Sequence, residues 1–252
     1  MPKTVIITLN RRRQTLTEDS RHRLVWKVVN ERLKVPASEL AIGICDMWDD
    51  HWAKGAAQRV NEMAPRMNKV ISAARDKGVT IIHEPSDTME FYKNSPARGR
   101  VKYAPAVEPP PEIAHDAPPK PVDDTGDVSD TPALDGLSEI VWTRQHKAIK
   151  IDDERDGISD DGREVWNFMQ ARGIKHYVIM GVHTGMCILD RKFAIKQMVK
   201  WGMDVMLCQD MTDALYSPAK PPYVSQQEGT QLIIGYIEKF WCPTIESRDL
   251  MK

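Results

Sequence analysis

The sequence predicts an α/β protein built on an open, mostly parallel β-sheet. The run from Leu40 to Cys45 is apolar throughout, as expected for a strand that is buried on both faces of such a sheet. The segment from Gly173 to Tyr216 then has the pattern of a strand, a turn, a helix and a second strand, which is the unit that parallel sheets repeat.

Within that segment, the short apolar run Tyr177–Met180 predicts a strand, and the amphipathic run from about Cys187 to Trp201 predicts a helix that Gly202 ends. Val205–Cys208 predicts the next strand. Cys187 stands where the helix begins, beside unpaired N–H groups and the positive end of the helix dipole. Both favour a thiolate, so we predict that Cys187 is a nucleophile with a lowered pKa.

The turn before this helix, GVHTGMC at residues 181–187, resembles the G-V-x-T-x-x-C signature of the isochorismatase-like cysteine hydrolases. That family includes nicotinamidases and N-carbamoylsarcosine amidohydrolase, and the resemblance extends from about Leu40 to about Ser247. It implies a three-layer α/β/α sandwich, Rossmann-like, around a mostly parallel sheet of about six strands. It also implies a catalytic aspartate, lysine and cysteine, and no cofactor.

The same resemblance implies a non-proline cis peptide bond between Val182 and His183. In the family, this bond helps to aim backbone N–H groups at an oxyanion, so His183 and Cys187 are the expected oxyanion-hole residues. The His183 side chain is also a candidate for substrate contact.

Composition limits the classes of function. The chain has 252 residues and a net charge of −1, which does not indicate a nucleic-acid partner. No run approaches the ~18 apolar residues of a membrane span, so we expect a cytoplasmic protein with no membrane partner. Its four cysteines, Cys45, Cys187, Cys208 and Cys242, lack metal-site spacing and are expected to be free thiols.

Two segments fall outside the family pattern. Residues 1–39 form an N-terminal extension in which Thr4–Leu9 and Leu24–Val29 predict two strands packed on the core domain of residues 40–252. We expect this extension to be a sheet edge or an oligomer contact, and the protein to be a homo-oligomer. Residues 104–136 are a proline-rich insertion, either an arm over the pocket or a passive surface loop.

Asp46 follows the strand Leu40–Cys45 at its carboxyl end, where open α/β sheets place their ligand sites. The stretch Asp46-Met47-Trp48 resembles the one that supplies the catalytic aspartate of the family. Asp46 is therefore the expected acid/base, since an aspartate near a thiol can accept its proton and pass it to a leaving amine. Trp48 is a candidate substrate contact that, with Trp52 and Trp142, would wall an apolar pocket for a planar ring.

The next strand, Val79–Ile82, follows a helix predicted from Met63 to Lys77 and ends at His83. Nicotinamidases carry a D-x-H metal pair near this point, and this chain lacks it. We therefore expect no metal, although His51 and His83 leave that question open. His83 is also a candidate substrate contact.

A third strand is predicted at Ile140–Thr143, followed by Arg144 where the family has its lysine. Arginine keeps its charge and can hold an anion, but it cannot shuttle protons. Lys147 is the alternative cation if the loop is displaced, and it is a candidate substrate contact. Further helices are predicted from about Gly162 to Ala171 and from Gly229 to Phe240.

Together these features predict a hydrolase in which Cys187 attacks a small amide-like substrate, Asp46 moves the proton and Arg144 stabilises charge. Two alternatives remain open. An isochorismatase-type cleavage of a vinyl ether would need the aspartate but no thiol, and a binding or scaffold protein would keep the fold without catalysis.

Overall fold

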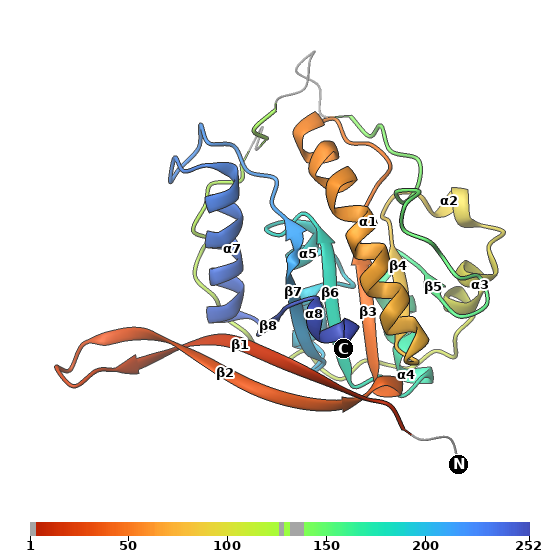
Figure 1. Cartoon of the computed structure of the whole chain (residues 1–252), viewed down its shortest axis with the longest axis horizontal. Helices are drawn as coiled ribbons and strands as arrows, with labels where there is room; N and C mark the ends of the chain where they lie inside the picture. The colour runs from red at the N-terminus through yellow and green to blue at the C-terminus, as the bar shows by residue number, and fades with distance from the viewer. Residues whose placement is uncertain (1–3, 126–128, 132–138) are drawn as a thin grey trace.

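The computed structural model describes residues 4–125, 129–131 and 139–252. Their sheet has eight strands in the order β2-β1-β8-β7-β6-β3-β4-β5 (Figure 1). The six strands from β8 to β5 are parallel to one another, and β1 and β2 form an antiparallel hairpin at one edge. The predicted α/β fold, with about six parallel strands, is confirmed.

The strands are β1 (Ile6–Glu18), β2 (Leu24–Pro36), β3 (Leu40–Cys45), β4 (Thr80–Glu84), β5 (Gly157–Ile158), β6 (His176–Val182), β7 (Asp204–Asp213) and β8 (Thr244–Ile245). The helices are α1 (Lys54–Asp76), α2 (Met89–Tyr92), α3 (Pro96–Lys102), α4 (Gly162–Ala171), α5 (Cys187–Asp190), α6 (Ile195–Lys200), α7 (Gln226–Phe240) and α8 (Arg248–Met251). A short 3₁₀ turn, η1 (Ala37–Glu39), joins the hairpin to β3.

The sheet is the middle of three layers because its strands are apolar on both faces. Ile42 and Ile44 of β3 pack with α1 and α8, whereas Ala41 and Cys45 of the same strand pack with α4–α7. Alternate residues of a strand point to opposite faces, so one continuous apolar run supplies both cores.

Two predicted helices have different bounds in the structure. Helix α1 begins at Lys54 rather than Met63, so Pro65 lies inside it rather than near its start. The prediction of a single helix from Cys187 to Trp201 is wrong. This segment forms two short helices, α5 and α6, and Arg191, the first residue after α5, has an extended backbone conformation.

The reason for this break lies in α4. A Cβ atom on Gly162 would stand 2.2 Å from the backbone oxygen of Lys192, so the chain between α5 and α6 packs closely on this glycine. Phe193 in the same turn is fully buried. Burial of this turn against α4 overrides the local helical pattern.

The prediction of a strand at Ile140–Thr143 is also wrong. Ile140 is 60% exposed, and no ladder forms there. Instead, Asp49 accepts hydrogen bonds from the N–H and hydroxyl of Thr143, at 2.9 and 2.8 Å, which ties the segment to the loop after β3. The strand that pairs with the other side of β4 from β3 is β5. The β-branched composition of residues 140–143 therefore predicted a strand in the wrong segment.

The N-terminal hairpin is longer than the two predicted strands. It crosses below the sheet and projects beyond α7 (Figure 1). At its base, Ile7, Leu9 and Val35 are buried in the core that contains α1. Farther along, Arg12 forms an ion pair with the buried Glu238 of α7. The base of the hairpin is therefore part of the folded body.

The proline-rich insertion has no regular structure between residues 104 and 125, but it packs on the layer of α4–α7. Ile113 N–H donates to the Lys200 carbonyl at 2.8 Å, and the Tyr236 hydroxyl donates to the Pro118 carbonyl at 2.8 Å. The insertion is thus a strap across these helices. Residues 126–128 and 132–136 of the segment lie outside the described residues.

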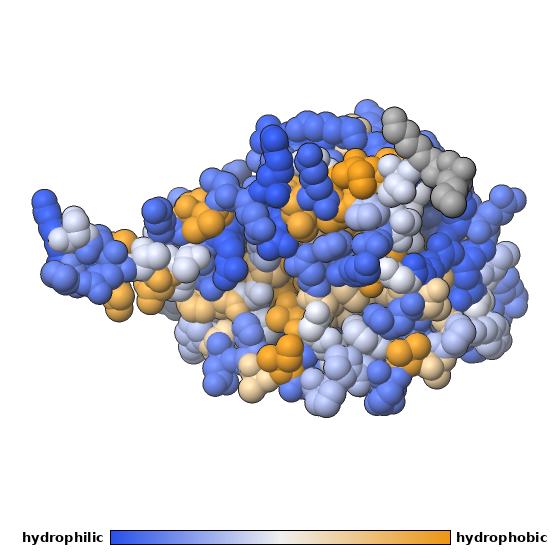
Figure 2. All heavy atoms as spheres, turned by 90° about the horizontal axis from the view of Figure 1, so that it is seen from below, coloured by the Kyte–Doolittle hydropathy of each residue, from blue (hydrophilic) through white to orange (hydrophobic). Residues whose placement is uncertain are grey.

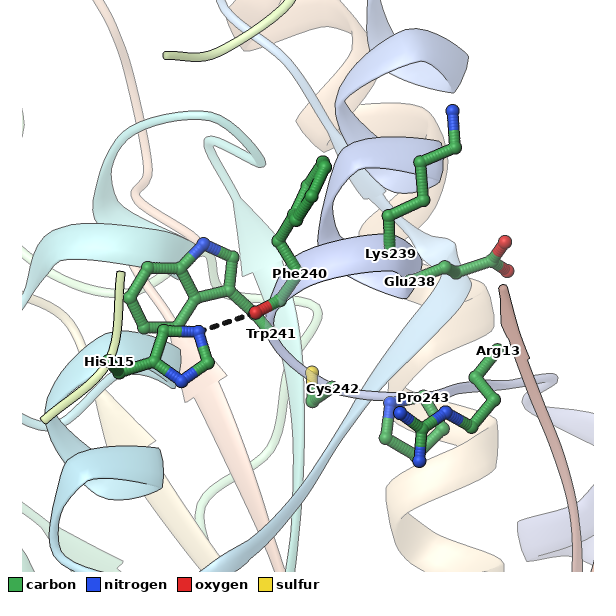
Figure 3. Close-up of a pocket in the computed structure, with 8 residues that line it drawn as sticks. All are labelled: Arg13, His115, Glu238, Lys239, Phe240, Trp241, Cys242 and Pro243. Atoms are coloured by element: carbon green, nitrogen blue, oxygen red, sulfur yellow. Dashed lines mark hydrogen bonds between the residues drawn. The ribbon is translucent and has the colours of Figure 1, made fainter. Parts of the chain in front are cut away.

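A pocket of about 270 Å³ lies where β1, the strap and the end of α7 meet (Figure 3). His115 of the strap stacks on Trp241 there, with ring centroids 4.1 Å apart, and Arg13 lines the other side. None of the described helices is long and apolar enough to cross a membrane.

Candidate active site

The two central strands bring Asp46 and Cys187 together. Strand β3 pairs in parallel with β6, and Cys45 stands opposite Gly181. Asp46 follows β3 directly, and the turn that leads to Cys187 follows β6. Because parallel strands end at the same edge of the sheet, two residues far apart in sequence become neighbours.

Gly181 is needed for this approach. It has φ = +116°, and a Cβ atom there would stand 2.0 Å from the Cys45 carbonyl oxygen. Asp46 has φ = +47°, which is uncommon outside glycine and is maintained by the packing around it. The first glycine of the GVHTGMC motif, Gly181, is thus required by the close packing of the two strand backbones.

The rest of the turn is anchored to the next strand. Thr184 N–H donates to the Asp213 carbonyl at 2.9 Å, and the Thr184 hydroxyl is 2.8 Å from that of Thr212. Both partners belong to β7, so the threonine of the motif positions the turn. The Val182–His183 peptide bond is cis.

The Asp46 carboxylate is buried and fully hydrogen-bonded. One oxygen accepts the N–H of Ser86 at 2.8 Å, and the other accepts Nε of Arg191 at 3.2 Å. The Cys187 thiol also forms a hydrogen bond with this carboxylate. A nucleophile, a carboxylate and a guanidinium therefore form one connected group at the carboxyl edge.

The electrostatics of Cys187 differ from the prediction. Burial raises the pKa of Cys187 and the charge of Asp46 raises it further, while Arg191 and the backbone N–H of His183 oppose the rise. Helix α5 has only four residues, so its dipole contributes little. The predicted lowering of the Cys187 pKa is therefore wrong, since burial and the Asp46 charge shift it upward.

Burial also raises the pKa of Asp46, and Arg191 and the hydrogen bonds from Cys187 and Ser86 oppose that rise. A thiol beside an aspartate can ionise by passing its proton to that carboxylate. The arrangement therefore suits a proton transfer that occurs when substrate binds.

The structure places Arg144 away from this group. Its side chain is 46% exposed, lies 3.7 Å from Asp49 and stacks over the ring of Phe91. Lys147 is exposed on the same loop. Within the described residues, neither side chain forms an ion pair or hydrogen bond with Asp46 or Cys187.

Arg191 is the residue that sequence reasoning missed. It lies four positions after Cys187, a spacing that places two side chains on one face of a helix, and this was the available signal. The helix ends at Asp190, however, and the contact with Asp46 spans 145 positions.

His83 does not face the site. Its two ring nitrogens lie 2.9 Å from Gln145 Oε1 and 3.0 Å from Asp156 Oδ2, inside a buried group that includes the Arg75–Asp156 ion pair. Both polar atoms of the ring are thus occupied by the protein, which leaves His83 a structural role rather than the expected substrate contact.

Trp48 and His183 belong to a buried aromatic group with His51 and Trp142. The rings of Trp48 and Trp142 stack at 4.1 Å, and those of His51 and His183 meet edge to face at 5.0 Å. Nε2 of His183 and Nε1 of Trp142 are buried without a hydrogen-bond partner among the described residues. Two buried polar atoms beside the site therefore lack a hydrogen-bond partner in the protein.

The solved structures that this chain resembles include proteins described as a cysteine hydrolase and as isochorismatases. A cysteine hydrolase from Pseudomonas syringae pv. phaseolicola 1448A superposes with a TM-score of 0.53 at 14% identity, over 86% of this chain and 92% of that one. A putative isochorismatase from Burkholderia xenovorans LB400 superposes with a TM-score of 0.52 at 12% identity, over 84% and 86% of the two chains. The chain has the isochorismatase-like fold.

An isochorismatase from Pseudomonas putida KT2440 is similar to the same extent, with a TM-score of 0.50 at 9% identity over 85% of this chain and 91% of that one. No family model and no curated protein matches the sequence. At such low identity the likeness establishes the isochorismatase-like fold, and the chemistry depends on the residues themselves.

The remaining thiols of this isochorismatase-like chain are separate from the site chemistry. Cys45, Cys208 and Cys242 are free and buried, whereas Cys187 is partly exposed. Burial raises the pKa of Cys242 and of Cys208. No cluster of three metal-ligating side chains occurs among the residues that the structure describes.

Proposed function

We propose that this protein is a cysteine hydrolase that cleaves a small amide or related carbonyl substrate. The observation that supports this most directly is the connected group of Cys187, Asp46 and Arg191. Its place at the carboxyl edge of an isochorismatase-like fold supports it as well, since structures of that fold carry cysteine-hydrolase and isochorismatase descriptions.

The reaction begins when Asp46 accepts the thiol proton and Sγ of Cys187 bonds to the substrate carbonyl carbon. The oxygen gains a negative charge, which backbone N–H groups of His183 and Cys187 stabilise. The Cys187 N–H has no acceptor among the described residues, as this role requires. The C–N bond then breaks, Asp46 gives its proton to the leaving nitrogen, and a thioester remains.

Water completes the cycle. Asp46 accepts a proton from the attacking water, the new C–O bond forms and the C–S bond breaks. The proton returns to Sγ, so the enzyme is restored and the products are an amine and a carboxylic acid. One carboxylate serves both halves of the cycle because it changes between base and acid.

Arg191 replaces the family lysine as the cation of the site. Its guanidinium lies beside Asp46 and opposes the effect of burial on the Asp46 pKa, so more of the carboxylate stays ionised. Arg191 cannot release a proton, which leaves all proton transfer to Asp46. Arg144 and Lys147 would then contact the substrate at most at the exposed edge of the site.

The aromatic group suggests the kind of substrate. The pKa of His183 is well below its usual value because the ring is buried, so the imidazole is neutral. Its free Nε2 can accept or donate one hydrogen bond, according to the tautomer. We infer that a planar substrate with a polar ring atom or substituent binds between this nitrogen and Trp48.

The raised pKa of Asp46 favours one other reaction. A carboxyl group that holds its proton can protonate a vinyl ether, which needs no nucleophilic sulfur. Isochorismatase-type cleavage is therefore the second candidate.

A screen of small amides with intact-mass detection of an acyl-enzyme tests the first candidate. The Asp46→Asn variant should be inactive in either reaction. The Cys187→Ala variant should lose amide hydrolysis and the mass adduct, and a Cys242→Ala variant is the matched control. Turnover that survives in Cys187→Ala would exclude the thiol mechanism and favour the vinyl-ether reaction.

A further inference from the structure

Strand β2 is an open edge of the sheet. It is the terminal strand and pairs only with β1 in the described structure. Its first nine residues, from Leu24 to Arg32, are all exposed, and five of them are apolar: Leu24, Val25, Trp26, Val28 and Val29. Apolar atoms lie along the projecting arm in the view from below (Figure 2). A long apolar edge of this kind is a template for another strand.

The backbone groups that face outward follow from the hairpin register. Asp19 pairs with Arg23 and Val5 with Ala37 through N–H···O bonds of 2.9 and 2.8 Å at the two ends of the hairpin. Odd-numbered residues of β2 therefore direct their N–H and C=O groups toward β1. The even-numbered residues, Trp26, Val28, Asn30 and Arg32 among them, direct theirs to the open edge.

We propose that this edge binds a second copy of the same chain, with the two β2 strands antiparallel and a two-fold axis at Val29. In this register Val28 of one copy exchanges backbone hydrogen bonds with Asn30 of the other, and Trp26 does so with Arg32. Both members of each pair are even-numbered, so every outward group between them finds a partner. The interface is self-complementary, as a two-fold axis requires.

The charges on β2 select this register. With the axis at Val29, Lys27 of each copy lies opposite Glu31 of the other, so two opposite-charge pairs form. An axis at Lys27 or at Glu31 would place like charges opposite one another, and an axis at Val28 or Asn30 would place each charge opposite an apolar residue. Cross-strand pairs of opposite charge are favourable and like pairs are not.

The neighbouring pairs agree with the same axis. Val25 lies opposite Leu33, and Val29 lies opposite its own copy, so apolar side chains flank the charges on that face. Trp26 lies opposite Arg32 on the other face, where its ring already contacts Lys239 and Phe240 of its own chain, with the Lys239 Nζ 5.3 Å from the ring centroid. Lys27 has no ion pair within the described residues of its own chain. Glu31 pairs with Arg11 of its own chain through Oε2 at 3.0 Å, so Lys27 of the second copy would add to that pair.

Cysteine cross-linking tests the register. Residues at a non-hydrogen-bonded position on the axis have Cα atoms about 4.5 Å apart, which a disulfide spans. Val29→Cys should therefore give a disulfide-linked dimer under mild oxidation. Val28→Cys is the matched control, because Val28 and Val29 are 43% and 39% exposed, but two copies of residue 28 would lie roughly 9 Å apart.

Sedimentation velocity over roughly a hundredfold range of concentration tests the interface itself. Asn30→Pro removes an outward N–H and leaves the bonds to β1 intact, so it should give a monomer with unchanged circular dichroism. Lys27→Glu should weaken association by about tenfold or more through repulsion from Glu31.

A wild-type protein that is monomeric throughout this range would overturn the interface. A dimer that persists in Asn30→Pro, together with equal cross-linking at residues 28 and 29, would also overturn it. Should Asn30→Pro fail to fold, preferential cross-linking at residue 29 in the otherwise native chain still decides the matter.

Discussion

Arg191 donates a hydrogen bond of 3.2 Å to the carboxylate of Asp46, the same group that holds the thiol of Cys187. This contact makes Arg191 the cation nearest to Asp46 in the proposed site. In the proposed reaction it separates two functions that a lysine can combine, since the arginine would supply charge while the aspartate alone would move the proton.

The first prediction concerns Arg191. Arg191→Ala should lower turnover by at least ~10², the scale lost with one electrostatic stabiliser, and Arg191→Lys should retain part of the activity. Arg144→Ala is the matched control, because its charge pairs with Asp49 instead. A large loss in Arg144→Ala with none in Arg191→Ala would reverse the assignment.

The pH profile of the same variants gives a second prediction. Activity needs ionised Asp46, so it should fall as the pH drops through the raised pKa of that group. Arg191 opposes that rise, so Arg191→Ala, which removes the charge, should move the acid limb of kcat/KM to higher pH, whereas Arg191→Lys, which keeps the charge, should move it less. An acid limb that stays in place or moves down contradicts the role of Arg191.

A third prediction concerns the reactivity of the thiols. Cys187 should react first with limiting iodoacetamide because the other three cysteines are buried. After burial, the charge of Asp46 is the largest cause of the raised Cys187 pKa, so Asp46→Asn should lower that pKa and speed labelling while it abolishes turnover. Peptide mapping measures both rates, and slower labelling in Asp46→Asn would show that the carboxylate activates the thiol even without substrate.

The strap gives a fourth prediction. Lys120 donates to the Gly185 carbonyl at 2.9 Å, in the turn that precedes Cys187, and pairs with Asp124. Lys120→Ala should loosen this turn, raise KM and speed proteolysis within residues 104–125. Lys102→Ala, at the exposed end of α3, is the control and should change neither. Unchanged kinetics in Lys120→Ala would make the strap a passive covering.

The buried ion pair under β4 and β5 gives a prediction of stability. Burial would raise the pKa of Asp156, but hydrogen bonds from His83 and Arg75 outweigh it, so the pKa is lowered. A lowered carboxyl pKa stabilises the fold above the unfolded value of ~3.9, and this contribution is lost as the pH falls through the folded value.

Asp156→Asn should therefore cost about 3–5 kcal/mol in urea unfolding at neutral pH, since it leaves Arg75 buried without its partner. Glu108→Gln breaks an exposed pair with Arg163 and is the control, with no measurable change expected. Equal stability of the two variants would mean that water reaches Arg75.

Local sequence by itself determined the parallel core and the two groups that are proposed to react. Leu40–Cys45 and Tyr177–Met180 are apolar enough to be buried on both faces, and the residue after each strand must then lie at the carboxyl edge. Asp46 and Cys187 follow from that rule. The composition of Ile140–Thr143 obeyed the same local preference and still formed no strand, because no neighbouring strand pairs with it.

Tertiary structure alone decided which cation lies beside Asp46 and in which direction the pKa of Cys187 shifts. Arg191 reaches Asp46 because the chain turns at the end of α5, where Lys192 packs against Gly162 of α4. The pKa of Cys187 rises because burial beside a carboxylate outweighs the effect of a short helix. Both depend on contacts between segments far apart in sequence, and the periodicity of a single helix contains no information about them.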